Sequence, residues 1–254
     1  TGVGQLLAEA AAAGARRVVV GLGGSGTNDG GAGALAELGA VADVPLDRGG
    51  LGLAGVTHVD LAEARARVQG LALVAATDVD SPLTGLFGAT KTFGPQKGID
   101  ENTQLALDGY LEAFAAITDR RLALKPGAGA AGGLGFALML LGGERISGVE
   151  LVAEAVGVLK HAASADLVIT GEGAFDFSSR VGKVPAGVAA LAAQALRPCI
   201  ALAGQVLVGS REMRALGMDS AYSLVEAVGE QRAFADPAGA LSEVTARVAR
   251  TWSR

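Results

Sequence analysis

Short apolar runs that lead directly into glycine-rich polar loops recur along the chain, and they constrain its fold more than any other feature. Three such runs end at Leu22, Ala76 and Ile169, and helical patterns lie between and after them. Strands that alternate with helices are typical of α/β proteins with a mainly parallel sheet. The carboxyl ends of parallel strands meet at one edge of a sheet, so we expect the three loops to converge on one cleft.

The hydrophobic periodicity assigns the remaining segments. Helices are expected near residues 5–13, 30–38, 103–118, 148–163, 183–196 and 237–254. Buried strands are expected at residues 18–22, 71–76, 167–169, 198–204 and 218–225. A domain boundary is expected near residues 142–150.

Composition narrows the class of protein. Half of the 254 residues are hydrophobic and 19% are charged, which is typical of a folded globular chain. A net charge of −5 argues against nucleic acid or an anionic membrane as the main partner. The single cysteine, Cys199, suits a reducing compartment and is expected to be a buried core thiol. Without a leader or a long apolar stretch, a cytoplasmic protein is expected, and the start at Thr1 inside a helical pattern suggests a fragment.

The first glycine-rich loop matches G-x-G-x-x-G at Gly21, Gly23 and Gly26. This pattern binds dinucleotides when an acid follows about twenty residues later at a strand end. Asp43 and Asp47 lie near that distance, but within a proline-containing loop. A dinucleotide-dependent oxidoreductase therefore stays an alternative, whereas no Gly-Lys-Ser/Thr follows to complete a Walker pattern.

The same loop carries Asn28 and Asp29 where the next helix should begin. A helix N-terminus attracts anions, and a carboxylate there repels them unless a cation or a hydroxyl proton lies between. Asp29 therefore suits either a Mg²⁺–phosphate site or a hydroxyl acceptor that must lose its proton. The alternative is that one of the two residues only caps the helix.

The loop expected after the strand at Ile169 holds two acids and a lysine. Glu172 and Asp176 are expected to bracket a turn and could hold Mg²⁺, and Lys183 could steady phosphate oxygens. The alternative is a solvated acidic loop.

Two further segments could bind anions. Asp78 and Asp80 end a strand and precede Lys91 and Lys97, which suits a nucleotide or acid pocket or, equally, a salt-bridged surface loop. The stretch 126–133 could be a backbone anion nest or a place of close helix packing. His58 and His161 are expected to be structural. Together the loops favour phosphoryl transfer, which relies on backbone donors, Mg²⁺ and lysine.

Five motifs occur in the order that is typical of the glycerate kinase type I family. They are GLGGSGTNDGGAG, DVDSPLTG, FGPQKG, GAGAAGG and ITGEGAFD, the last followed by a Gly-Lys pair and a proline. The resemblance implies a kinase that uses ATP and Mg²⁺ to phosphorylate D-glycerate, giving 2-phosphoglycerate or 3-phosphoglycerate. It also implies two α/β domains, a Rossmann-like parallel sheet and an inserted domain. Residues 1–150 then resemble the inserted domain, and 151–254 the C-terminal part of the Rossmann-like one.

The chain departs from the family pattern in two ways. The Asp-Ser-Phe-Lys-Gly element that opens other members is absent, which keeps an inactive fragment or a binding module as an alternative. Ser178 replaces the usual Gln and Gly26 the usual Ala.

The resemblance and the loop chemistry together assign roles. Asp29 is the expected general base, Lys97 and Lys183 neutralise phosphate or carboxylate charge, and the Mg²⁺ ligands are Glu172 and Asp176. The residues expected to contact substrate or phosphate are Gly23, Gly24, Ser25, Asn28, Asp78, Gln96, Gly127, Gly129, Gly171 and Gly173. The expected partners are D-glycerate and ATP, with no nucleic acid and no membrane, and the sequence does not fix the oligomeric state.

Overall fold

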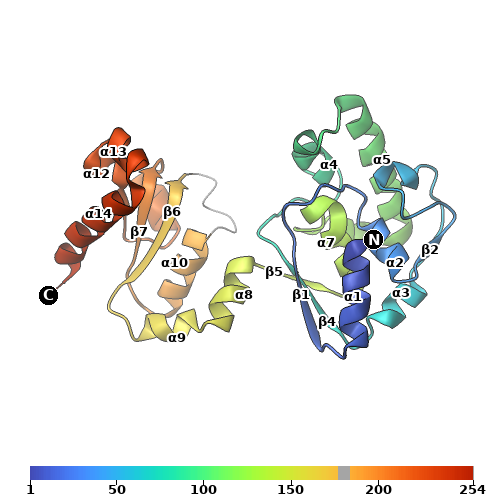
Figure 1. The fold of residues 1–254 in the computed structure, drawn as a ribbon, viewed down its shortest axis with the longest axis horizontal. Coiled ribbons are helices and arrows are strands. Elements are labelled where there is room, and N and C mark those ends of the chain that lie inside the picture. Colours follow the sequence, from blue (N-terminus) through green and yellow to red (C-terminus); the bar gives the residue numbers. More distant parts are fainter. Residues whose placement is uncertain (177–183, 254) are drawn as a thin grey trace. The chain divides into compact units, whose positions relative to one another are not determined.

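The chain folds into two compact units in a computed structural model that describes residues 1–176 and 184–253 (Figure 1). The first unit is Thr1–Ser147 and the second is Gly148–Arg254. This division falls within the expected boundary region, 142–150. That the two units correspond to an inserted domain and part of a Rossmann-like domain stays a prediction. Ser178 and Lys183 lie outside the described residues.

The first unit is built on a parallel three-stranded sheet with the order β1-β4-β5. Its strands are β1 (Arg17–Gly21), β4 (Ala72–Ala76) and β5 (Glu144–Ile146), and a short antiparallel pair joins β2 (Val41–Ala42) to β3 (Val59–Asp60). β4 lies in the middle and is buried as expected. The prediction of a buried strand at 18–22 is wrong, because β1 is an edge strand with one neighbour and Val19 is 50% exposed.

Helices surround this sheet and share one hydrophobic core. They are α1 (Gly2–Ala12), α2 (Ala32–Glu37), α3 (Ala62–Arg67), α4 (Ala89–Phe93), α5 (Glu101–Thr118), α6 (Arg120–Ala123) and α7 (Ala130–Leu140), with the 3₁₀ turns η1 (Gly50–Leu53) and η2 (Pro95–Lys97). At the centre, the rings of Phe114 and Phe136 meet edge to face, with centroids 6.1 Å apart. The expected amphipathic helix at 103–118 is α5, which begins two residues earlier because Asp100 caps it.

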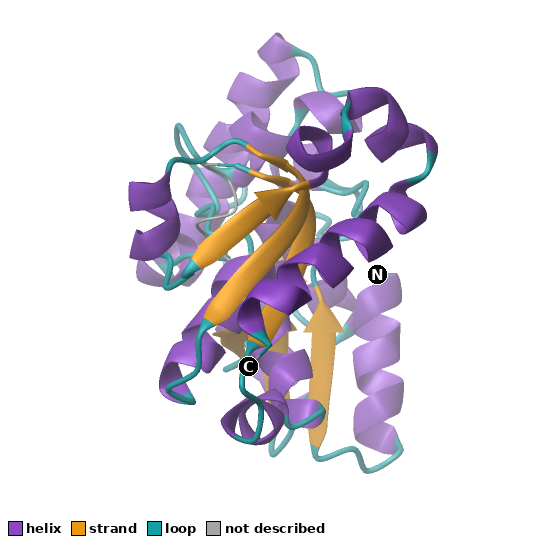
Figure 2. Cartoon of the chain, turned by 90° about the vertical axis from the view of Figure 1, so that its left-hand side faces the viewer, coloured by secondary structure: helices purple, strands orange, loops and turns teal. Residues whose placement is uncertain are grey.

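The second unit has another parallel sheet, with the order β6-β7-β8 (Figure 2). Its strands are β6 (Val168–Phe175), β7 (Cys199–Val206) and β8 (Ser220–Ser223), and its helices are α8 (Gly148–Ala155), α9 (Val158–Ala163), α10 (Val184–Gln194), α11 (Ser210–Ala215), α12 (Leu224–Val228), α13 (Glu230–Ala235) and α14 (Pro237–Trp252). The single helix expected at 148–163 is two helices, because Gly157 turns the chain with a φ of 70°. The α/β class with parallel sheets is confirmed.

Side chains of β7 alternate between two separate clusters in the second unit. Cys199, Ala201 and Ala203 pack on the side of α10, whereas Ile200 and Leu202 pack on the side of α12 and α14. This alternation is the two-residue period of a strand covered on both faces. An apolar hollow of about 570 Å³ remains on the α12–α14 side, where Ile169 is 48% exposed.

A membrane-spanning helix must be both long and apolar. None of the described helices combines the length and the apolar composition that a membrane crossing needs.

Candidate active site

A pocket of about 140 Å³, with both polar and apolar lining residues, lies in the first unit, at the edge of the sheet where β1 and β4 both end. The loop after β1, the turn η2 and the start of α7 surround it. Its lining residues are Leu22, Gly23, Gly24, Ser25, Val79, Phe93, Gln96, Lys97, Ala131 and Gly132. Five of the expected site residues, Gly23, Gly24, Ser25, Gln96 and Lys97, are therefore neighbours, although about 70 residues of chain separate the two groups.

Lys97 is the cation of this pocket. Its ammonium donates hydrogen bonds to Ser25 Oγ, at 3.0 Å, and to the carbonyl oxygen of Thr27. Burial lowers the pKa of Lys97, and the nearby carboxylate of Asp29 partly offsets this effect because it favours the charged ammonium. The contacts fix a positive charge beside the Gly23–Ser25 backbone, where an incoming carboxylate or phosphate would meet it.

Asp29 binds the backbone at the start of α2, where the N-cap residue itself is Gly31. Its two carboxylate oxygens accept hydrogen bonds from the backbone N–H groups of Gly31, at 2.9 Å, and Gly33, at 3.2 Å. Neither Asn28 nor Asp29 is the N-cap residue, but Asp29 satisfies two N–H groups at the helix start, as the capping alternative required. These contacts do not use the whole carboxylate, since each oxygen keeps a second lone pair. The same residue can bind the start of α2 and still accept a proton.

Asn28 is 8% exposed and its amide is only half satisfied. Nδ2 donates a hydrogen bond to Oγ1 of Thr90, at 2.9 Å. Oδ1 is buried without a hydrogen-bond partner among the described residues. The sequence analysis missed Thr90, because no pattern in the sequence links a residue of α4 to one 62 positions earlier.

The glycine-rich stretch 126–133 serves close packing. Ala131, Gly132 and Gly133 have left-handed φ values of 52°, 69° and 96°. A Cβ on Gly132 would come within 2.0 Å of the Thr27 carbonyl oxygen, and the Gly30 N–H donates to the Gly132 carbonyl at 2.9 Å. Backbone thus meets backbone here, which supports the packing alternative over the anion nest.

Gly127 and Gly129, which were expected to bind substrate, are both buried and do not line the pocket. A Cβ on Gly127 would meet the side chain of Arg145, and one on Gly129 would meet the carbonyl of Pro82. Both positions therefore have close neighbours where a larger residue would place its Cβ.

The loop after β4 is held by ion pairs and hydrogen bonds. Asp80 pairs with Arg145 at 2.6 Å, and Ser147 donates a hydrogen bond to Asp78 at 2.7 Å. Asp80 therefore fits the salt-bridged alternative. Both contacts tie the end of β4 to residues at or just after β5.

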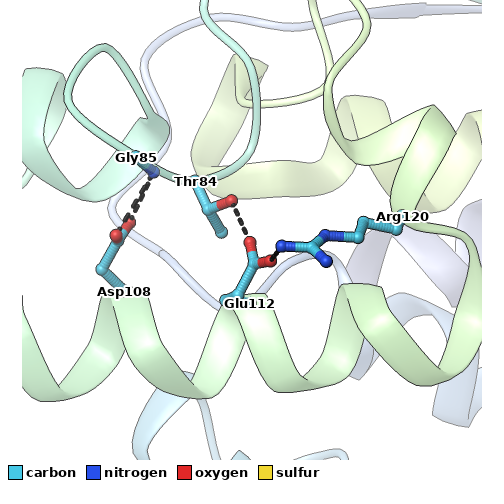
Figure 3. A network of polar contacts seen from close by, with 5 residues as sticks. All are labelled: Thr84, Gly85, Asp108, Glu112 and Arg120. Atoms are coloured by element: carbon cyan, nitrogen blue, oxygen red, sulfur yellow. Dashed lines mark hydrogen bonds and ion pairs between the residues drawn. The ribbon is translucent and has the colours of Figure 1, made fainter.

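Acidic side chains of α5 hold the segment that leads from this loop to the pocket (Figure 3). Asp108 accepts the backbone N–H of Gly85 at 3.2 Å, and Glu112 accepts the hydroxyl of Thr84 at 2.7 Å. Glu112 also pairs with Arg120 at 2.7 Å. Burial raises the pKa of Asp108, against the opposing effect of the Gly85 N–H. One face of α5 thus positions the chain shortly before α4.

The remaining expected residues lie in the second unit. The expectation that the strand ends at Ile169 is wrong, since β6 continues through Phe175 and includes Gly171, Glu172 and Gly173. Glu172 and Asp176 therefore do not bracket a turn. An extended strand rises about 3.3 Å per residue, so four residues separate their backbones by up to roughly 13 Å.

This geometry bears on Mg²⁺ binding. Among the described residues, no group of three or more His, Cys, Asp or Glu side chains is placed to hold a metal ion. Glu172 and Asp176 do not fit as a chelating pair, but Mg²⁺ often takes one carboxylate together with waters and substrate phosphates. A single one of these acids suits that role.

The cysteine and the two histidines were expected to have structural roles. Cys199 is fully buried in β7, and desolvation, followed by the charge of Asp219, raises its pKa to about 11, which confirms a core thiol. His58 and His161 are both exposed.

The whole length of the chain matches one family of known proteins. Residues 1–253 match the model described as the glycerate kinase family. The chain belongs to the glycerate kinase family. The resemblance inferred from the five motifs is thereby confirmed.

Individual relatives agree with this family. The chain is 39% identical to a glycerate kinase of Halalkalibacterium halodurans, covering all of this chain and 70% of the relative. It is 39% identical to the glycerate 2-kinase of Escherichia coli, covering 90% of this chain and 62% of the relative. An uncharacterized protein of Mycobacterium bovis is 41% identical, covering 98% of this chain and 61% of the relative.

A solved structure has the same fold. A crystal structure assigned provisionally to glycerate kinase 2 of Salmonella typhimurium LT2 superposes with a TM-score of 0.68 at 38% identity. The matched region covers 87% of this chain and 59% of the Salmonella typhimurium chain. The chain thus spans about 60% of the length of several glycerate kinase relatives.

The dinucleotide alternative does not fit the structure of this glycerate kinase family member. In a dinucleotide fold the helix opens within the G-x-G-x-x-G motif. Here β1 ends at Gly21 and α2 begins only at Ala32. A Cβ on Gly26 would meet nothing within 4 Å, so the close helix–strand packing that the third glycine of the motif serves is missing.

Proposed function

We propose that the protein, in its complete natural chain, transfers the γ-phosphoryl group of ATP to D-glycerate. Membership of the glycerate kinase family supports this activity. The observation that carries it is the pocket where the Lys97 ammonium lies against Ser25 and close to the Asp29 carboxylate. The name of the Escherichia coli relative favours 2-phosphoglycerate over 3-phosphoglycerate as the product.

Lys97 and the Gly23–Ser25 backbone form the anion-binding side of the proposed site. A fixed ammonium and free backbone N–H groups stabilise the negative charge of a carboxylate or a phosphoryl group. Burial strengthens this interaction, because a partly desolvated cation attracts an anion more strongly than a hydrated one. Gln96 adds an amide at the same wall of the pocket.

Asp29 is the proposed general base. Its carboxylate would take the proton of the attacking glycerate hydroxyl with a lone pair that the N–H contacts of Gly31 and Gly33 leave free. The two N–H donors also hold the carboxylate in one orientation. The structural role of Asp29 thereby serves the chemical one.

ATP and Mg²⁺ complete the proposal. Mg²⁺ would supply positive charge at the phosphate oxygens, with Glu172 or Asp176 as the carboxylate from this chain. The strand glycines Gly171 and Gly173, together with Asp78 and Lys183, stay predicted contacts. A cytoplasmic location also stays a prediction.

A substitution at Asp29 separates the two roles of this residue. Asn cannot take a proton at neutral pH, and its one amide oxygen can still accept one of the two N–H groups that Asp29 binds. Urea unfolding of Asp29→Asn, compared with that of the unaltered protein, measures what the lost N–H contact costs in stability. We expect kcat for D-glycerate to fall about 10²- to 10⁴-fold while the KM for ATP changes little. The assay couples ADP release to an indicator reaction, uses the complete natural chain, and identifies the phosphorylated carbon by phosphorus NMR.

Three results would count against the proposal or a part of it. An unchanged kcat in Asp29→Asn would leave this residue with its contacts at the start of α2 only. Lys97→Met should abolish productive glycerate binding, whereas Lys91→Met, at an exposed lysine of α4, is the matched control and should leave kinetics unchanged. Equal effects of both lysine substitutions, or no glycerate phosphorylation by the unaltered protein, would overturn it.

A further inference from the structure

Thr90 contacts both the loop after β1 and the segment that leads into η2. It is the second residue of α4 and is 0% exposed, and it does not line the pocket. Its hydroxyl oxygen accepts the Nδ2–H of Asn28, the residue that precedes the proposed base. A buried hydroxyl bonded to a buried amide is a directional contact, and apolar packing alone would not need it.

The Oδ1 end of the Asn28 amide is not explained by stability alone. Oδ1 has no hydrogen-bond partner among the described residues, and a buried unpaired acceptor destabilises a fold. Leu has nearly the shape of Asn, and Val that of Thr. An apolar pair of this kind would fill the same space without the unpaired oxygen. A polar pair that lowers stability suggests a functional reason for its presence.

The backbone of Thr90 shapes the opposite wall. Its carbonyl oxygen accepts the N–H of Gly94 at 2.8 Å, and a Cβ on Gly94 would lie only 2.3 Å from that oxygen. The contact ends α4 and starts η2, which carries Gln96 and Lys97. Lys97 then returns to the first loop through Ser25 and Thr27.

The two segments are therefore joined at two points. One is the contact of Asn28 with Thr90, and the other is the contact of Lys97 with Ser25. Backbone contacts with Gly132 also hold this loop, so the contact with Thr90 sets chiefly the orientation of the Asn28 amide. Small displacements of reacting groups strongly reduce rates.

We propose that Thr90 is a positioning residue for phosphoryl transfer: its hydroxyl sets the orientation of the Asn28 amide and, with Lys97, holds the Ser25–Asp29 loop against η2. This inference rests on the proposed function of the pocket. Thr90 itself touches no substrate. Its effect on turnover passes through Asn28.

The test uses isosteric variants of the complete natural chain. Thr90→Val removes the hydroxyl and keeps the volume, and Thr90→Ser keeps the hydroxyl. We expect Thr90→Val to lower kcat/KM for D-glycerate on the order of 10- to 100-fold, with the KM for ATP unchanged, and Thr90→Ser to restore most of the loss. Thr92→Val, at an exposed threonine of the same helix, is the matched control and should behave as the unaltered protein.

A double-mutant cycle shows whether Thr90 acts through Asn28. Asn28→Leu should lower kcat/KM strongly, and the double variant Asn28→Leu/Thr90→Val should be no slower than Asn28→Leu alone. The double variant should also unfold at a urea concentration at least as high as the unaltered protein, because it removes the unpaired Oδ1. Additive kinetic losses would overturn the inference.

The remaining outcomes separate this inference from the proposed function. If Lys97→Met abolishes activity but Thr90→Val does not lower it, the pocket stands and the role of Thr90 is refuted. If Lys97→Met and Asn28→Leu both leave glycerate turnover unchanged, the proposed site itself is wrong and the inference fails with it.

Discussion

The first unit has one continuous core, whereas the second has two thin clusters on either side of its sheet. In the first, helices and strands share a single interior around Phe114 and Phe136, and glycines bring backbone against backbone. In the second, small residues of β7 face α10, and an apolar hollow of about 570 Å³ is left on the other face. Both units have a parallel three-stranded sheet, so the difference lies in how closely the covering elements approach it.

The difference explains where precisely held polar groups occur. The contacts of Lys97, Asn28 and Asp29 depend on loops that cannot move relative to one another. A close-packed interior transmits small changes in shape to such loops, whereas a loosely covered sheet absorbs them. We therefore expect the first unit to be the more sensitive of the two to substitution.

The largest contrast should come from two phenylalanines. Phe114→Ala removes a fully buried ring of the first unit, and it should lower the free energy of unfolding by about 3–5 kcal/mol. Phe234→Ala removes a ring of the second unit that is 67% exposed, and we expect a loss within about 0.5 kcal/mol. Urea unfolding followed by circular dichroism measures both, and equal losses would contradict the comparison.

Two glycines give the next contrast. Gly132→Ala forces a Cβ into the Thr27 carbonyl at a φ of 69°, so overpacking and backbone strain should together cost about 2–4 kcal/mol. Gly173→Ala in β6 meets nothing within 4 Å and should change stability by less than about 1 kcal/mol. The same urea titration applies. A tolerated Gly132→Ala would show that the Thr27–Gly30 loop can move away.

The smallest effect should be a pH dependence at Asp108. Its pKa in the folded protein is raised by burial, despite the nearby Lys91, so its stabilising contribution is present at low pH and is lost as pH rises through the folded value. Asp108→Asn does not titrate. The difference in melting temperature, Asp108→Asn minus unaltered protein, should therefore increase as the pH rises from roughly 3.5 to 7.

A matched substitution controls for general charge effects in this experiment. Asp166→Asn, at an exposed aspartate of the second unit, should show no such trend. A constant difference between Asp108→Asn and the unaltered protein across this pH range would show that Asp108 does not titrate differently in the folded state.

Local patterns predicted much of the fold. The helix at α5 follows from its apolar spacing and from Asp100 as a cap, and β4 follows from its unbroken apolar run. The extension of β6 through Gly171 and Gly173 could not be predicted, because glycines usually end strands. Here pairing with β7 keeps them extended. The exposure of β1 depends on its place at the sheet edge, which the sequence of one strand does not contain.

The site was predicted in part for a similar reason. Motif chemistry identified Ser25, Gln96 and Lys97 as candidates, but only the fold shows that they are neighbours. Thr90 was missed because its importance lies in a contact with Asn28 and not in any pattern of its own. Gly127 and Gly129 pack closely against their neighbours, and their contact with substrate stays a prediction. The sequence could not show the packing, because a glycine that binds an anion and one that packs tightly look alike in a sequence.

The solitary thiol at Cys199 is a natural reporter. It lies within β7 with no exposed surface, and the chain has no other cysteine. A thiol-specific reagent added to the native protein can therefore react only when the second sheet opens, and the first unit stays silent. The labelling rate of the unaltered protein thus measures how often β7 becomes accessible, without any engineered probe.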